Sequence, residues 1–80
     1  MHIERVALPG IGVRYAFTTA HGHRLGVICH RDGRRELVVF DTVDPDSALG
    51  RALMDPIEAD HVADLLRHKV IDTHPNPPND

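Results

Sequence analysis

The chain has 80 residues, 41% of them hydrophobic and 26% charged, and its formal net charge at pH 7 is −3. This length suffices for one small domain, and the acidic balance argues against a nucleic-acid-binding protein, which normally carries a basic surplus. A single cysteine, Cys29, excludes an internal disulfide, and no apolar run reaches the roughly 20 residues that a membrane span needs, so we expect a cytoplasmic protein without direct membrane insertion.

The first half of the chain has the pattern of an antiparallel β-meander. The segment VRYAFTTA alternates with period two, which is typical of a strand with one heavier apolar face. Asp32-Gly33 lies between two further apolar segments and predicts a type I′ hairpin turn, because that turn needs positive φ at both central residues. The predicted strands are 3–7, 13–20, 25–30 and 36–40.

The second half contains one helix with a clear beginning. Asp55 is the expected N-cap, Pro56 occupies the first helical position, and Glu58 follows the cap by three residues. Residues 48–54 fit a short helix and a strand equally well. An apolar stripe at helical spacing should cover the sheet; it consists of Ala59, Val62, Ala63, Leu66 and Val70. The fold class is therefore α+β, a small antiparallel meander of four to five strands covered by one C-terminal helix.

The sequence LPGIG at residues 8–12 raises the question of a phosphate-binding loop. A dinucleotide-binding fingerprint requires a third glycine and a helix that begins at the loop. Here Tyr15 occupies the third glycine position, a strand follows, and the Lys-Ser/Thr ending of a P-loop is absent. The two glycines therefore indicate a tight connection between strands, and we expect no cofactor.

No catalytic group stands out in the sequence. Cys29 and His30 are adjacent on a predicted strand, so their side chains should lie on opposite faces and cannot form a dyad. Cys29 aligns with Leu25 and Val27, which indicates a small core residue. Ser47 lacks the G-x-S-x-G context of a nucleophilic serine. We expect a protein that is not an enzyme.

Histidine is the unusual component of the chain. Seven are present, and their full protonation would change the formal net charge from −3 to +4 near the pH at which histidine titrates. His61, Asp64 and His68 are spaced by three and four residues, hence on one face of the predicted helix. His21 and His23 share a face of a hairpin turn. These five residues form pH-sensing or interaction patches, or a small metal- or ligand-binding module, or simply a solvated surface.

Two further features favour protein contacts. Arg31, Arg34 and Arg35 cluster at the Asp-Gly hairpin and could meet an acidic partner, although most such turns are only solvated. The chain has no Trp, one Tyr and two Phe, and a core this light favours a homodimer.

Five motifs follow one another along the chain: LPGIG, VRYAFTTA, DGRR, DPD and DPIEADHVADLL. Their order resembles the N-terminal domain of bacterial cation/proton antiporter regulatory subunits of the KhtT type, over about residues 3–70. The spacing of the first and third motifs is the most specific part of the resemblance. The motif residues to which we assign a structural role are Leu8, Pro9, Gly10, Gly12, Asp32 and Gly33.

The resemblance implies a non-enzymatic, dimeric subunit that docks on a membrane antiporter and controls the exchange of potassium, or another monovalent cation, for protons. It also implies a location peripheral to the inner membrane. Family members usually carry a second, C-terminal domain that can bind a cyclic dinucleotide, and no residue here matches that domain. We therefore expect residues 1–72 to form the antiporter-regulatory domain and the polar, Pro-rich residues 73–80 to be a tail or a linker to a missing C-terminal ligand-binding domain.

Overall fold

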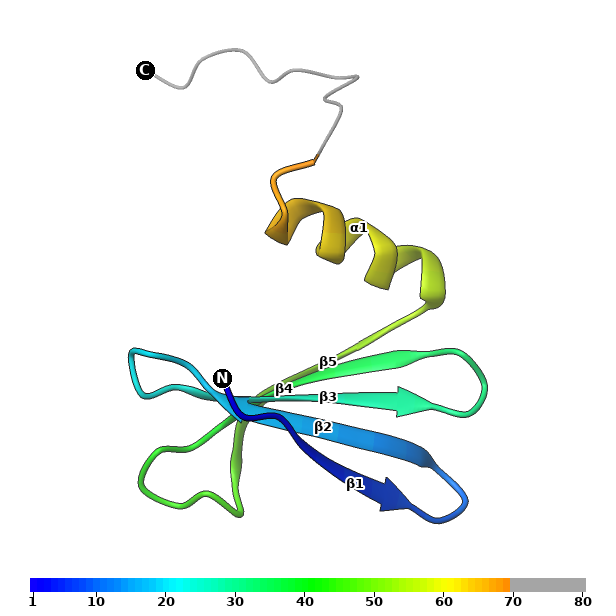
Figure 1. Ribbon diagram of the computed structural model, residues 1–80. Coiled ribbons are helices and arrows are strands. Elements are labelled where there is room, and N and C mark those ends of the chain that lie inside the picture. The colour runs from blue at the N-terminus through cyan, green and yellow to red at the C-terminus, as the bar shows by residue number, and fades with distance from the viewer. Residues whose placement is uncertain (70–80) are drawn as a thin grey trace, which may run out of the picture.

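The computed structural model describes residues 1–69 and contains a five-stranded sheet and one helix (Figure 1). The elements are β1 (Glu4–Leu8), β2 (Gly12–Thr18), β3 (Arg24–His30), β4 (Arg35–Phe40), β5 (Ala48–Met54) and α1 (Pro56–Leu66). Each strand pairs antiparallel with the next, so the sheet order is β1-β2-β3-β4-β5. The predicted α+β class is confirmed, and residues 48–54 are the edge strand β5. Val70 and the predicted tail at 73–80 lie outside the described residues.

LPGIG forms the turn between β1 and β2. The Ile11 N–H donates to the Leu8 carbonyl at 2.9 Å, and Gly10 has a φ of +78°. Proline at the second position of a turn and a left-handed glycine at the third are the requirements of a type II turn. The predicted strand-to-strand connection is confirmed.

The turn between β3 and β4 differs from the predicted type I′ turn. Gly33 has a φ of +96°, whereas Asp32 does not have a positive φ, so the type I′ prediction is wrong. The Gly33 N–H donates to the His30 carbonyl at 3.1 Å, and the His30 N–H donates to the Arg34 carbonyl at 3.0 Å. This is a three-residue loop that ends in a left-handed glycine, and one positive φ is enough for it.

The sheet has two chemically different faces, because directly paired residues of neighbouring strands lie on the same face. The polar face carries Glu4, Arg14, Ala16, Arg24, Gly26, Ile28, His30, Glu36, Val38 and Arg51. The apolar face carries Val13, Tyr15, Phe17, Leu25, Val27, Cys29, Leu37, Val39 and Met54, with Arg35 at its end.

The buried side chains lie on the polar face. Ala16, Ile28 and Val38 are 2%, 9% and 1% exposed, whereas no residue of the apolar face within the described chain is buried. The loop 41–47 returns over the polar face, and the Phe40 ring packs against Gly26. Cys29, which the sequence predicts as a core residue, is only half-buried. The small residues of the polar face therefore form the interior, and the heavier apolar face stays open.

Helix α1 has the predicted beginning. Asp55 is its N-cap, Pro56 follows, and the Asp55 N–H donates to the Glu58 carboxylate at 2.9 Å. The helix lies on the side of the sheet away from the loop 41–47 (green, lower left in Figure 1). The predicted C-terminal helix is present, but none of its residues is buried, and Leu66 of the predicted apolar stripe is 82% exposed. A connection of one residue, Asp55, holds the helix beside the edge strand β5, with which it makes its main contact.

Candidate functional site

The two glycine-containing turns lie side by side and form one corner of the molecule. The Arg31 N–H donates to the Ile11 carbonyl at 2.8 Å, which joins the β3–β4 turn to the β1–β2 turn. Between them is a hollow of about 290 Å³, which we call the corner hollow; it is lined by Gly10, Ile11, His30, Arg31, Asp32 and Arg34. The fold thus brings together the two motifs whose spacing is the most specific in the sequence.

Gly12 fixes the approach of β2 to β3 beneath this corner. A Cβ atom at Gly12 would lie 1.9 Å from the carbonyl oxygen of Cys29 and 3.1 Å from the Cα of His30. Both neighbours are backbone atoms, so no side chain can be accommodated without moving a strand. The second glycine of LPGIG therefore has a structural role.

Two of the three predicted contact arginines line the corner hollow. The Arg34 Nε donates to Asp32 Oδ2 at 2.7 Å, and both side chains are exposed. The Arg34 backbone N–H also donates to Asp32 Oδ1 at 3.0 Å, and this hydrogen bond holds the pKa of Asp32 below its usual range. Arg31 is exposed. The Arg35 guanidinium donates to the Arg34 carbonyl at 2.9 Å and belongs to β4, outside the hollow's lining.

A half-buried charge cluster on the polar face continues from the corner hollow. The Nε2 of His30 lies 3.1 Å from Glu36 Oε1, and the Arg51 guanidinium donates to Glu36 Oε2 at 3.3 Å. The Glu36 side chain is only 15% exposed. Sequence analysis missed this cluster. The period-two pattern on either side of the Asp-Gly turn places His30 and Glu36 on one face and could have indicated it.

The five predicted pH-sensing residues are not brought together. His21 and His23 are exposed in the β2–β3 turn, and His61 is exposed on α1. Asp64 pairs with Arg67 at 3.4 Å. Within residues 1–69 no group of three His, Cys, Asp or Glu side chains is close enough to hold a metal ion.

His68 does not share a helix face with His61 and Asp64, so that prediction is wrong. Helix α1 ends at Leu66, and His68 has a left-handed φ of +56°. The His68 N–H donates to the Leu65 carbonyl at 3.0 Å, and the Lys69 N–H donates to the Asp64 carbonyl at 2.8 Å. This pair of bonds is a Schellman motif, in which the chain leaves the helix before His68.

Exposed apolar side chains form the other distinctive surface. On the apolar face Tyr15 and Val39 are 36% and 37% exposed, and on α1 Ile57 and Leu65 are 71% and 63% exposed. Within the described residues no helix has the length and apolar character needed to cross a membrane.

Comparison with known proteins gives one matching family and several relatives. The family model "K(+)/H(+) antiporter subunit KhtT, N-terminal domain" matches residues 1–70. The chain is 38% identical over 66 residues to the K(+)/H(+) antiporter subunit KhtT of Bacillus subtilis, and 33% identical over 66 residues to the uncharacterized protein YrvC of the same species. Each alignment covers 82% of this chain and 40% of the relative.

A third relative is the Ammonium/H(+) antiporter subunit AmhM of Alkalihalophilus pseudofirmus. It is 37% identical over 46 residues, which are 58% of this chain and 28% of that protein. The chain thus spans less than half the length of these curated relatives.

Proposed function

The chain belongs to the family of KhtT N-terminal domains, and from this premise we propose that it is a non-enzymatic regulatory domain of a membrane antiporter that exchanges potassium, or another monovalent cation, for protons. Two relatives support the proposal, since both are named antiporter subunits. The proposal places the domain in the cytoplasm, at the inner membrane through its antiporter partner.

The observation that carries the proposal is the open apolar face. Side chains such as Tyr15 and Val39 form a continuous apolar surface over three central strands, and none of them is buried. Contiguous exposed apolar surfaces are typical of protein–protein contact sites. A domain of this kind acts by binding another protein.

We assign the apolar face to a second copy of this chain. Within residues 1–69 only three hydrophobic side chains are buried, namely Ala16, Ile28 and Val38, and domains with so small an interior commonly gain stability from a partner subunit. A two-fold contact would pair each apolar face with the same face of the second copy. The homodimer is therefore the expected working form.

We assign the contact with the antiporter to the corner hollow. Arg31 and Arg34 present exposed guanidinium groups there, which suit an acidic segment of the antiporter. The hollow lies at the end of β3, whereas the apolar face spans the middle of the strands. Both contacts can therefore be made at the same time.

The pH response that we propose arises from overall charge. His21, His23, His61 and His68 are exposed and occupy separate parts of the surface. Their protonation changes the sign of the net charge, which alters the attraction to a charged partner without a local switch. We further propose that residues 73–80 lead to a second domain, since the curated relatives are more than twice as long as the aligned segment.

Transport measurements test the proposed function. Membrane vesicles containing the potassium/proton antiporter of the same organism are assayed for potassium-driven proton movement, with and without the purified chain. We expect the chain to change the exchange rate and an R31E/R34E variant to lose the effect. An R67E variant, with its charge reversal at the C-cap of α1, serves as the control and should act like the wild type. An unchanged rate with the wild-type chain would contradict the proposal.

A further inference from the structure

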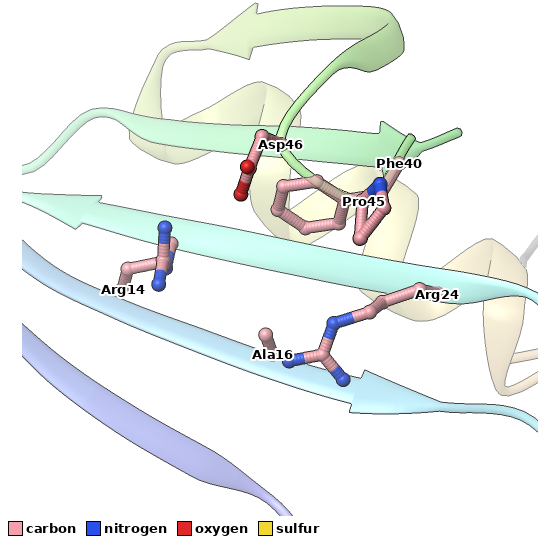
Figure 2. A pocket seen from close by; sticks show the side chains of 6 residues that line it. All are labelled: Arg14, Ala16, Arg24, Phe40, Pro45 and Asp46. Atoms are coloured by element: carbon pink, nitrogen blue, oxygen red, sulfur yellow. The ribbon is translucent and has the colours of Figure 1, made fainter. Parts of the chain in front are cut away.

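The polar face holds a second cavity that the proposed function does not use. It has a volume of about 270 Å³ and is lined by Arg14, Ala16, Arg24, Phe40, Pro45 and Asp46 (Figure 2). Arg14 and Arg24 extend from β2 and β3 on either side of Ala16, and the loop 41–47 places Pro45 and Asp46 above them. We call this cavity the arginine cavity.

Arg14 is the least satisfied charged residue of the described chain. Its Nε is buried and has no hydrogen-bond partner, and none of the ion pairs within residues 1–69 includes it. Its direct cross-strand neighbours are Val6 and Ile28, which offer no acceptor side chain. Arg14 as a whole is only half-buried, but a buried N–H donor without an acceptor destabilises the folded protein unless a ligand supplies that acceptor.

The other residues that line the arginine cavity indicate which ligand could supply an acceptor for Arg14. Arg24 supplies a second guanidinium, which is shared with Thr18 and Glu4 but is still 29% exposed. The Phe40 ring and Pro45 add an apolar wall. Asp46 is an anion in the same lining, yet it forms no ion pair with either arginine. Two guanidinium groups facing one cavity fit a doubly charged oxyanion with several acceptor oxygens.

We propose that the arginine cavity binds a phosphate group, either as free inorganic phosphate or on a small phosphate monoester. Arg14 and Arg24 donate hydrogen bonds to the phosphate oxygens, and one of these oxygens accepts from the buried Nε–H of Arg14. Phe40 and Pro45 contact the substituent of an ester. Asp46 repels the ligand, and hydrogen bonds from the Asp46 N–H and the Ser47 hydroxyl to Asp44 hold the loop that carries it.

Amide NMR of the full 80-residue chain tests this site with two probes, inorganic phosphate and phenyl phosphate, each against sodium chloride at equal ionic strength. We expect saturable shifts at residues 14, 16, 24 and 46, with a Kd at or below about 1 mM. Tighter binding of phenyl phosphate identifies the ligand as a monoester, and equal binding identifies the free ion. The absence of saturable shifts at these residues with both probes overturns the proposal.

Four variants assign the binding to particular side chains. R14K keeps the charge but loses the fork of donors, and R24Q removes the second guanidinium; each should weaken binding about tenfold or more. D46N should tighten binding severalfold because it removes a like charge. R67Q removes an exposed arginine at the C-cap of α1 and is the matched control, expected to bind like the wild type. Unchanged affinity in both R14K and R24Q overturns the assignment.

Discussion

Val38 and Val39 are neighbours on β4, yet they belong to two different environments. Val38, on the polar face, is 1% exposed, and Val39, on the apolar face, is 37% exposed. The polar face is closed by its own loop, residues 41–47, and by the Phe40 ring over Gly26. The apolar face has the heavier side chains but no closely packed cover. Burial here is decided by which segment returns over a face, and the open face is the one suited to a partner.

The largest expected effect comes from the strand pairing that both faces share. In G12A the new Cβ would overlap the Cys29 carbonyl, so β2 and β3 must separate. We expect a loss of more than about 3 kcal/mol in the free energy of unfolding, a large part of the stability of so small a domain. Urea unfolding followed by circular dichroism measures it. G50A, where no atom lies within 4 Å of the added Cβ, is the control and should change stability by less than about 0.5 kcal/mol.

The adjacent valines test the difference between the faces directly. V38A should lower the free energy of unfolding by about 2 kcal/mol at every chain concentration, because it leaves a cavity in the closed interior. V39A should lower the free energy of unfolding by less than about 0.5 kcal/mol in dilute solution. This loss should grow with chain concentration, because the substitution also weakens binding of the second copy. If V38A and V39A lowered the free energy of unfolding equally and at every chain concentration, both faces would be closed within one chain.

A smaller effect is expected at the end of α1, on the open side of the sheet. His68 adopts a left-handed φ of +56° in the Schellman motif, and such a conformation costs a residue with a Cβ about 1 kcal/mol relative to glycine. H68G should therefore raise the free energy of unfolding by about 0.5–1 kcal/mol, as measured by urea unfolding. H61G, in the middle of the helix, should instead lower it. A destabilised H68G would contradict the described helix end.

The smallest expected effect concerns Asp32 at the charged corner. Its folded-state pKa is lowered, chiefly by the Arg34 N–H, so its contribution to stability is present above the ordinary pKa and is lost as the pH falls through the lowered value. D32N should be slightly less stable than the wild type at neutral pH, and this difference should vanish at a pH low enough to protonate Asp32 in the folded protein as well. Urea unfolding at both pH values measures it. A difference that persists in acid would mean that the carboxylate's charge is not responsible.

Local patterns predict the first four strands and the helix, but they leave residues 48–54 open and do not indicate the side of the sheet on which the interior lies. The alternation in VRYAFTTA, the Pro-Gly and Asp-Gly turns and the Asp55 cap depend on neighbours in sequence, and each element forms where expected. The position of the loop 41–47 over Ala16 depends on tertiary packing, which no local pattern encodes. The heavier apolar residues were therefore assigned to an interior that the structure places on the other face.

The candidate sites also depend in part on tertiary packing, which local sequence patterns do not encode. The clustering of Arg31 and Arg34 follows from one short turn motif, whereas the corner hollow that they line depends on contact with the β1–β2 turn. His68 was misplaced because a non-glycine residue gives no sequence signal for a left-handed helix end. The sequence does not indicate the arginine cavity, because Arg14 and Arg24 line it together only through the pairing of β2 with β3 and the position of the loop 41–47.

The measurement that tests the central claim most directly is the molar mass of the purified chain, from size-exclusion chromatography with light scattering. We expect a wild-type dimer, a monomer for V39E and a dimer for V43E, whose charge is placed on an equally apolar but 90% exposed loop residue. A wild-type chain that stays monomeric at all concentrations, or a V39E variant that remains dimeric, would contradict the assignment of the apolar face to a second copy.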